Sequence, residues 1–196
     1  MKRIFDILLS GIGLLLLSPL FFVLALWIKC DSHGPVFYKQ LRVGRGNRDF
    51  TLYKFRSMTV GSDRKGLITV GRDDPRVTRA GYYIRKYKFD ELPQLINVFK
   101  GDMSLVGPRP EVRKYIEMYT PEQMKILTMR PGITDPASIK YRNENELLTT
   151  TEHPEEFYIK VIMQDKLAIN LQYLESHTLF KDFKIILNTF VSILRY

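Results

Sequence analysis

A proline interrupts the longest apolar segment of the chain. Residues 7–28 carry no charged side chain, and as one straight helix they would extend ~33 Å, about the thickness of a bilayer's hydrocarbon core. Pro19 lies near the middle, where it removes the hydrogen bond to the Leu15 carbonyl and disrupts the preceding turn. The Ser18 hydroxyl can satisfy backbone groups that the proline frees. We therefore expect two shorter helices that meet at Ser18 and Pro19.

The charges around this segment favour a helix that enters and leaves a membrane on one side. Lys2 and Arg3 precede the segment, and Lys29 is the first of several basic residues after it. Because positive residues tend to stay on the cytoplasmic face, a re-entrant helix satisfies both flanks and a straight span only one. A kinked transmembrane anchor is the alternative; a cleaved signal peptide is disfavoured by the length of the apolar run. We expect residues 1–29 to form a re-entrant membrane helix and residues 30–196 a domain at the cytosolic face.

Two later segments alternate polar and apolar side chains with a period of two, as half-buried strands do. They are residues 36–43 and 50–56, joined by residues 44–49, and they predict a β-hairpin with a basic tip. Gly44 and Gly46 have the spacing of neither a dinucleotide-binding nor a Walker loop, so a turn is favoured over a phosphate loop.

Helices are expected near the C-terminus, at residues 158–176 and 181–196. The second has an apolar stripe at helical spacing, which we expect to pack on the core; contact with a membrane is the alternative. The stripe consists of Phe183, Ile186, Leu187, Phe190 and Leu194. The predicted fold class is α/β and mostly helical, with a re-entrant N-terminal membrane helix, a small β-hairpin and amphipathic surface helices.

Composition limits the chemistry. The 196 residues suffice for one domain or one domain plus an appendage, and 45% apolar with 26% charged residues is typical of a globular chain. The single cysteine, Cys30, excludes an intramolecular disulfide and a zinc site built on cysteine pairs. The three histidines are scattered along the chain, so a structural metal is not expected.

The net charge of +9 is concentrated in one third of the chain. Residues 29–89 contain 15 lysines and arginines against 5 aspartates and glutamates. Such a block is suited to a polyanion: nucleic acid, anionic lipid headgroups, or a diphosphate or triphosphate ligand. The sequence contains no recognition helix, zinc finger or stacking pattern of the kind nucleic-acid modules use, so we do not expect nucleic acid to be a partner.

Two adjacent carboxylates, Asp90 and Glu91, follow this basic block. As a structural feature they suit the start of a helix over residues 90–99, with Asp90 as the cap and Pro93 in the first turn. As a functional pair they lie at the N-terminus of the expected helix, where an anion can be held. Successive side chains on a helix point ~100° apart, so the two carboxylates are suited to two different roles. One carboxylate can attack phosphorus while the other holds Mg²⁺ against substrate phosphates.

Five motifs in one order make the chain resemble a known family. They are Lys54-Phe-Arg-Ser-Met58, Asp73-Asp-Pro-Arg-Val-Thr78, Asp90-Glu-Leu-Pro-Gln-Leu95, Gly101-Asp-Met-Ser-Leu-Val-Gly-Pro-Arg-Pro-Glu111 and Arg130-Pro-Gly-Ile-Thr134. The sequence resembles the bacterial sugar transferases, the small monotopic polyprenyl-phosphate phosphoglycosyl transferases, over essentially its whole length.

The resemblance implies an enzyme of the inner bacterial membrane that starts the assembly of polysaccharides and glycoconjugates. It would move a sugar phosphate from a nucleoside diphosphate sugar, usually a UDP-sugar, to a polyprenyl phosphate such as undecaprenyl phosphate, through a covalent phosphosugar intermediate. Asp90 matches the family nucleophile and Glu91 the acidic partner associated with Mg²⁺, so both are candidate metal ligands. Ser18 and Pro19 match the family's helix break.

Basic side chains are the candidates for holding the donor's phosphates, because phosphoryl transfer depends mostly on positioning and electrostatic stabilisation. Arg109 is fixed between two prolines, with a structural role as the alternative. The candidate substrate-binding residues are Lys54, Arg56, Arg85, Arg109 and Arg142. The competing hypothesis is a non-catalytic, membrane-anchored module that binds anionic lipid or a protein partner; a homodimer is left open, and so is the identity of the sugar.

Overall fold

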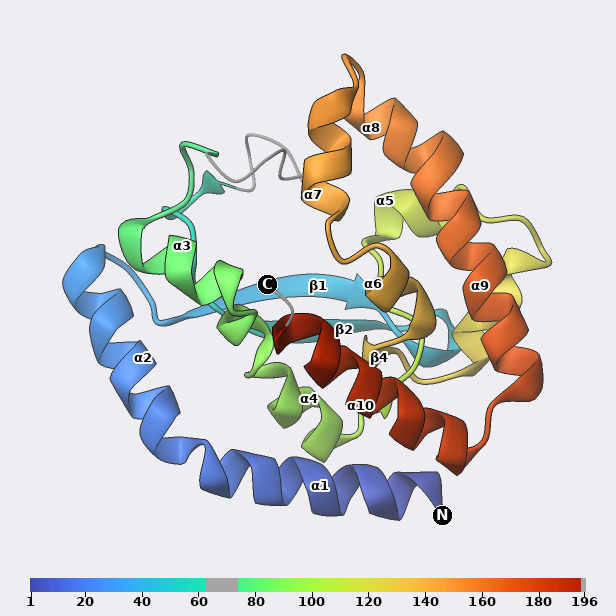
Figure 1. Ribbon diagram of the computed structural model, residues 1–196, viewed down its shortest axis with the longest axis horizontal. Helices are drawn as coiled ribbons and strands as arrows, with labels where there is room; N and C mark the ends of the chain where they lie inside the picture. Colours follow the sequence, from blue (N-terminus) through green and yellow to red (C-terminus); the bar gives the residue numbers. More distant parts are fainter. Residues whose placement is uncertain (63–73, 195–196) are drawn as a thin grey trace.

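The computed structural model describes residues 1–62 and 74–194 and is mostly helical, around a small two-stranded hairpin (Figure 1), as the predicted fold class requires. The helices are α1 (Lys2–Leu16), α2 (Ser18–Asp31), α3 (Arg79–Lys86), α4 (Gln94–Lys100), α5 (Arg113–Ile116), α6 (Pro136–Lys140), α7 (Glu144–Leu147), α8 (Pro154–Phe157), α9 (Met163–Ser176) and α10 (Leu179–Leu194). The strands are β1 (Phe37–Val43), β2 (Asp49–Phe55), β3 (Ser104–Val106) and β4 (Gly132–Thr134). A π-helical turn over Tyr158–Ile162 leads into α9, so the helix expected at residues 158–176 is confirmed.

The apolar N-terminal segment is broken where the sequence predicts. Helices α1 and α2 meet at Leu17 with a bend of 59°, and Pro19 lies in the first turn of α2. Ser18 Oγ donates to the Leu15 carbonyl at 2.8 Å, which satisfies the acceptor that Pro19 leaves without its usual partner. Among the described residues no single helix has the length and apolar character to cross a membrane, whereas α1 and α2 taken together meet that test.

Helix α1 turns its polar side toward the rest of the protein. Asp6 is only 3% exposed and accepts hydrogen bonds from Ser104 Oγ at 3.1 Å and from the Leu105 amide at 3.0 Å. Lys2 forms an ion pair with Asp182 of α10, with 2.5 Å between Nζ and Oδ2. The further contacts are from Lys2 to the Val106 carbonyl and from Arg3 to the carbonyls of Val98 and Phe99. These bonds leave the apolar side of α1 facing outward.

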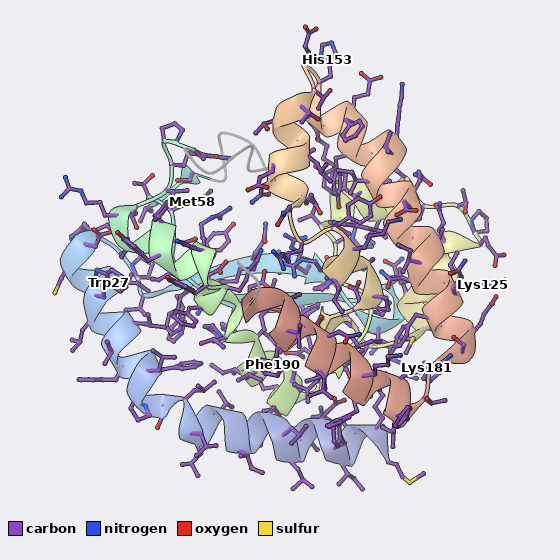
Figure 2. The ribbon with its side chains drawn as sticks, viewed as in Figure 1. Trp27, Met58, Lys125, His153, Lys181 and Phe190 are labelled. Carbon is purple, nitrogen blue, oxygen red and sulfur yellow. The ribbon has the colours of Figure 1, made fainter. Side chains whose placement is uncertain are left out.

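Exposed apolar side chains gather on the outward sides of α1 and α2 and on α10 (Figure 2). On α1 and α2 they include Ile4, Leu8, Ile12, Leu15, Leu16, Phe22, Val23 and Leu26. On α10, Phe183 is 51% exposed and Phe190 is 62% exposed. The expectation that the α10 stripe packs on the core is wrong for Phe183, Leu187 and Phe190, because Asp182 and Ile185 occupy the buried side of the helix, but it is confirmed for Ile186, which packs against a core cluster. The side chain of Leu194 lies outside the described part of the chain.

The β-hairpin lies at the centre of the fold (Figure 1), and its strands pair antiparallel from Phe37 opposite Phe55 to Val43 opposite Asp49, as predicted. Its connection includes Gly46 with a φ of 69°, a left-handed conformation that glycine adopts without strain. Phe55 is buried in an apolar cluster that joins β2 to α2 and α3, and the cluster consists of Leu24, Ile28, Phe55, Ala80 and Ile84. This packing fixes the end of β2 beside the loop that follows α3.

Strands β3 and β4 form a separate parallel pair. Gly107, which follows β3, and Gly132, the first residue of β4, allow their two chain segments to approach each other closely. A Cβ atom on Gly132 would lie 2.1 Å from the Gly107 amide nitrogen, and one on Gly107 would lie 2.4 Å from the Arg130 carbonyl oxygen. Both distances are far below any real contact, so neither position accepts a side chain without a backbone shift. The glycine pair thereby fixes the point at which the segment Pro108-Arg109-Pro110 leaves β3.

Candidate active site

The two candidate catalytic carboxylates lie in a short 3₁₀ turn, Phe89–Glu91, between α3 and α4. The turn begins after Lys88, which has a φ of 57°, an uncommon left-handed conformation for a residue other than glycine. Helix α4 begins only at Gln94, with Pro93 before it and no side chain capping it. The prediction of a helix that begins at Asp90 and is capped by it is therefore wrong. Helix capping does not explain why a carboxylate is present at position 90.

Asp90 is buried and incompletely bonded. Its side chain is 8% exposed, and Oδ1 has no hydrogen-bond partner in the part of the chain that the structure describes. Burial raises the pKa of Asp90, and the neighbouring charge of Glu91 raises it further. The charges of Lys54, Arg85 and Lys88 oppose this rise and favour the carboxylate. The site therefore holds a buried carboxyl group with one unpaired oxygen.

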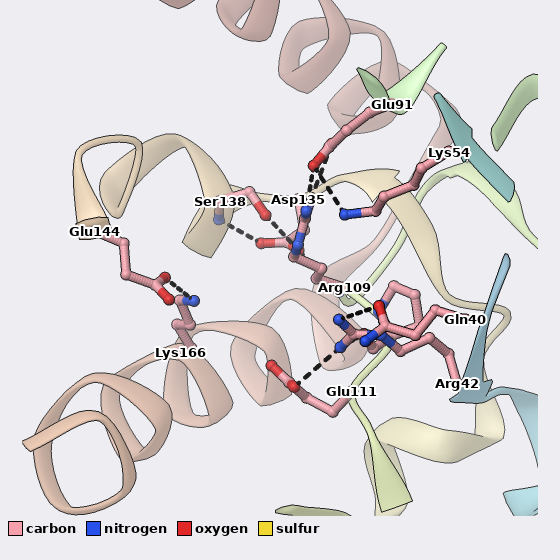
Figure 3. Close-up of polar contacts among 11 residues, drawn as sticks. Gln40, Arg42, Lys54, Glu91, Arg109, Glu111, Asp135, Ser138, Glu144 and Lys166 are labelled. Carbon is pink, nitrogen blue, oxygen red and sulfur yellow. Dashed lines mark hydrogen bonds and ion pairs between the residues drawn. The ribbon is translucent and has the colours of Figure 1, made fainter. Parts of the chain in front are cut away.

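Glu91, in contrast, is held by two cations. Arg109 Nη1 donates to Oε2 at 3.1 Å, Arg109 Nη2 donates to Oε1, and Lys54 Nζ lies 3.7 Å from Oε1 (Figure 3). Burial opposes ionisation, but the charges of Arg109 and Lys54 outweigh it and keep the pKa of Glu91 far below its usual value. Burial lowers the pKa of Lys54 to about 8, although Glu91 offsets part of the effect. Glu91 in turn raises the pKa of Arg109.

The adjacent carboxylates thus have different environments. Glu91 is a fixed anion whose two oxygens are bound by cations, whereas Asp90 retains an unpartnered oxygen. Arg109 and Lys54, both predicted to bind substrate phosphates, lie together at Glu91. The site therefore combines a positive cluster at Glu91 with a neighbouring carboxyl group that keeps an unpartnered oxygen.

Arg109 is positioned by Asp135, a residue that the sequence did not point to. Asp135 is fully buried, and its Oδ2 accepts a hydrogen bond from the Arg109 amide at 2.9 Å (Figure 3). The same carboxylate accepts bonds from the Ser138 amide at 2.7 Å and the Ser138 hydroxyl at 3.0 Å, so it also caps α6. Burial raises the pKa of Asp135. Its position directly before Pro136 is the only local sign, and that sign indicates a helix cap.

Arg85 and Arg56 have different places in the structure. Arg85 is half-buried on α3, and its charge lowers the pKa of Asp90, so it lies within electrostatic range of the site. Arg56 is 4% exposed and donates to backbone carbonyls at the end of α2, those of Ile28, Ser32 and His33. We therefore correct the prediction for Arg56, because its guanidinium group closes the C-terminal end of a helix instead of facing the dyad.

Arg142 lies near the C-terminal end of α10, where Nη1 donates to the Ser192 carbonyl. Its predicted contact with the donor stays a prediction.

The dyad fits a magnesium ion only in a mode that the substrate completes. The described residues contain no group of three or more His, Cys, Asp or Glu side chains arranged to hold a metal. Mg²⁺, however, keeps several waters and is commonly bound by one or two carboxylates together with substrate phosphates. Asp90 supplies one carboxylate whose Oδ1 lacks a protein partner, whereas both oxygens of Glu91 are already bound by Arg109 and Lys54. Asp90 therefore fits a Mg²⁺ ion whose other ligands are waters and substrate phosphates, and Glu91 would join it only by sharing an oxygen with those cations.

Comparison with known proteins identifies the family. The family model described as bacterial sugar transferase matches residues 1–196. The chain is 36% identical over 196 residues to the UDP-glucose:undecaprenyl-phosphate glucose-1-phosphate transferase of Caulobacter vibrioides, an alignment that covers 98% of this chain and 69% of that protein. It is 34% identical over 203 residues to the exopolysaccharide production protein ExoY of Rhizobium meliloti, covering 96% and 83%. The chain therefore belongs to the bacterial sugar transferase family, as its five motifs predict.

One relative is considerably longer than this chain. The UDP-N-acetylgalactosamine-undecaprenyl-phosphate N-acetylgalactosaminephosphotransferase of Aeromonas hydrophila is 49% identical over 141 residues, which is 70% of this chain and 33% of that protein. The chain thus corresponds to about a third of one relative and to more than two thirds of the other two.

Proposed function

We propose that this protein transfers a sugar phosphate from a UDP-sugar to undecaprenyl phosphate and so begins the assembly of a polysaccharide or glycoconjugate. The activities for which its relatives are named support the substrates and the reaction. The observation that carries the proposal is the unequal pair at the 3₁₀ turn, in which Glu91 is bound by Arg109 and Lys54 while buried Asp90 keeps an unpartnered oxygen.

In the proposed first step, Asp90 attacks the phosphorus that bears the sugar. The bond from that phosphorus to the bridging oxygen breaks, and uridine monophosphate leaves with the bonding electrons. The product is a phosphosugar esterified to the carboxylate. In the second step, an oxygen of undecaprenyl phosphate attacks the same phosphorus, which restores the Asp90 carboxylate and gives the undecaprenyl diphosphate sugar.

The surrounding charges suit this chemistry. Lys54, Arg85 and Arg109 place positive charge around the dyad, where it would stabilise the negative charge of the transferring phosphoryl group. Glu91 fixes the orientation of Arg109 and keeps its own charge. Asp90 and Glu91 would hold Mg²⁺, whose chemistry at this site is to neutralise diphosphate charge.

We also propose that the protein is monotopic, with α1 and α2 re-entrant in the inner bacterial membrane and residues 30–196 at its cytosolic face. The 59° bend, the basic residues on both sides of the apolar segment and the outward apolar faces of α1, α2 and α10 support this placement. An acceptor carried by lipid keeps its phosphate in the headgroup layer. A site at that depth would let it meet a water-soluble donor.

The deciding experiment incubates the detergent-solubilised protein with single UDP-sugars and Mg²⁺ and measures its intact mass. The proposal expects an added mass equal to one sugar phosphate, which disappears when undecaprenyl phosphate is supplied, together with release of uridine monophosphate. A non-catalytic anchor that binds anionic lipid through its basic residues predicts no adduct and no release with any donor, and that outcome would overturn the proposal.

A further inference from the structure

A single buried side chain bonds helix α4 to the β-hairpin. Asn97 lies on α4 and is fully buried. Its Nδ2 donates to the Thr51 carbonyl at 2.7 Å, and its Oδ1 accepts from the Tyr53 amide at 3.0 Å. Because Thr51 and Tyr53 are alternate residues of β2, both backbone groups point to the same edge of the strand. Asn97 therefore takes the hydrogen-bonding position of a further strand, on the edge of β2 opposite β1.

The amide group of Asn97 has one possible orientation. Nδ2 also donates to Asp102 Oδ2 at 3.3 Å. A carboxylate oxygen and a carbonyl can only accept, and a backbone N–H can only donate. If the amide oxygen and nitrogen changed places, two donors would face each other at Tyr53 and two acceptors at Thr51. The three bonds therefore fix both the position and the rotation of this side chain.

The backbone of Asn97 directs the chain toward Arg109. Its carbonyl accepts hydrogen bonds of 3.0 to 3.2 Å from three successive amides, those of Gly101, Asp102 and Met103. This turn leads directly into β3, and the chain beyond β3 carries Arg109. Asn97 therefore connects α4, β2 and the segment that leads to Arg109.

The connected segments supply the residues that meet at the dyad. Lys54 follows Tyr53 on β2, and Glu91 lies in the 3₁₀ turn before α4. Lys54 Nζ and Glu91 Oε1 are 3.7 Å apart, and Figure 3 shows Lys54 and Arg109 converging on Glu91. A shift of α4 along β2 by one strand position would move Glu91 by about 3.3 Å relative to Lys54. Such a shift is enough to break the contact.

Apolar packing at the same joint does not determine this alignment. Leu52, Val98 and Met103 form a buried cluster between α4, β2 and the start of β3. Hydrophobic contact is not directional, whereas a hydrogen bond weakens steeply as its angle changes. The cluster therefore holds α4 against β2, and the bonds of Asn97 determine where along the strand it is held.

We propose that Asn97 is a positioning residue for phosphoryl transfer, because its bonds to β2 set the location of the dyad relative to Lys54. The inference rests on the proposed transferase function. Without these bonds α4 can shift on β2 while the apolar cluster keeps the fold. The cation that stabilises the transferring phosphate is then misplaced, so the chemical step slows more than donor binding weakens.

The test measures kcat and KM of Asn97→Ala and Asn97→Asp with a UDP-sugar that the wild type uses. Asn97→Asp keeps the acceptor for Tyr53 and sets an oxygen against the Thr51 carbonyl. In both variants we expect kcat to fall by about tenfold to a hundredfold and KM for the donor to change by less than about threefold.

Val98→Ala is the matched control. It removes apolar packing from the same joint and leaves the amide bonds in place. This variant should lower the Tm and keep kcat within about threefold of the wild-type value. A fall in kcat as large as that of Asn97→Ala would show that any weakening of the joint suffices, and would overturn the inference.

A double-substitution cycle separates positioning from general loss of structure. The rate of adduct formation is followed by intact mass with donor alone. If Asn97 acts through Lys54, Asn97→Ala should slow this rate much less in a Lys54→Gln background than in the wild type. A residue that only supports the fold would slow it by the same factor in both backgrounds, and equal factors would overturn the inference.

Asp102→Ala decides the question if neither Asn97 variant folds. It removes one acceptor of the Asn97 amide from a partly exposed position. A fall in kcat of about threefold or more supports the inference, and a smaller change overturns it. A folded Asn97→Ala with wild-type kcat would overturn the inference and leave the transferase intact. Absence of turnover and of any adduct in the wild type with every UDP-sugar would overturn the proposed function itself.

Discussion

Arg109 binds Glu91 through both of its terminal nitrogens, so one arginine fixes the charge state and the orientation of the residue next to Asp90. The contact keeps Glu91 ionised, and the resulting negative charge helps to raise the pKa of Asp90. Arg109 also lines a small pocket, and Asn170 is part of the same pocket wall.

Replacing Asp90 tests the proposed nucleophile. Asp90→Asn keeps the shape of the side chain and removes the charge that attacks phosphorus, so kcat should fall by at least about a thousandfold. The phosphosugar adduct should be absent from the intact mass. Glu175→Gln neutralises an exposed carboxylate on α9 and should retain both activity and adduct. An adduct of normal yield on Asp90→Asn would exclude this residue as the nucleophile.

Replacing Asp135 tests how Arg109 is positioned. Asp135→Ala leaves the Arg109 amide without its 2.9 Å acceptor, and the resulting freedom of the guanidinium group should lower kcat by about tenfold to a hundredfold. Asp135→Asn retains an acceptor oxygen and should recover part of this loss. Thermal unfolding must accompany both measurements, because Asp135 also caps α6. Equal loss in the two variants at equal stability would show that the hydrogen bond to Arg109 is unimportant.

Lys54 should set the alkaline limit of activity. Its pKa is lowered to about 8 mainly by burial, so the ammonium group is charged below this pH and neutral above it. If its charge stabilises the transferring phosphate, kcat/KM falls as the pH rises through about 8. Lys54→Arg stays protonated to a much higher pH and should move the decline upward. Lys100→Arg, with the wild-type lysine half exposed, is the control. Identical alkaline profiles for all three proteins would contradict the assignment.

Gly132→Ala should destabilise the segment that carries Arg109. The new Cβ atom would lie 2.1 Å from the Gly107 amide nitrogen, so the backbone must move. We expect a loss of about 2–4 kcal/mol in the free energy of unfolding, measured as a lower Tm. Gly11→Ala, whose Cβ atom would lie 3.4 Å from the Phe99 ring, should change the Tm little. An unchanged Tm in Gly132→Ala would show that the chain segments at Gly107 and Gly132 can move apart at no cost in stability, and would contradict the prediction.

The helix break can be tested by topology. Pro19→Ala restores a backbone N–H and the bond to Leu15, which should favour a straighter helix and place part of the N-terminal segment across the bilayer. A reporter cysteine at Lys2, in a Cys30→Ser background, should then lose labelling from the cytosolic side. The same reporter with Pro19 intact should remain labelled. Equal cytosolic labelling of both proteins would contradict the proposed role of the break.

Local features were predictable because their causes lie within a few residues. The helix break follows from the missing N–H of Pro19, and the hairpin follows from strict alternation over a short stretch. Whether the α10 stripe packs on the core or faces outward could not be decided from the sequence, since periodicity defines a face but not what covers it. Asp135 was missed because its partner, Arg109, lies 26 positions away along the chain. Arg56 was misassigned because the nearby end of α2 is set by tertiary packing.

The ion pair between Lys2 and Asp182 joins segments that are 180 positions apart. During synthesis, α1 leaves the ribosome well before α10 is made, so the ammonium group of Lys2 cannot form this ion pair until Asp182 has been synthesised. The contact that joins α10 to α1 therefore forms only after nearly the whole chain has been synthesised.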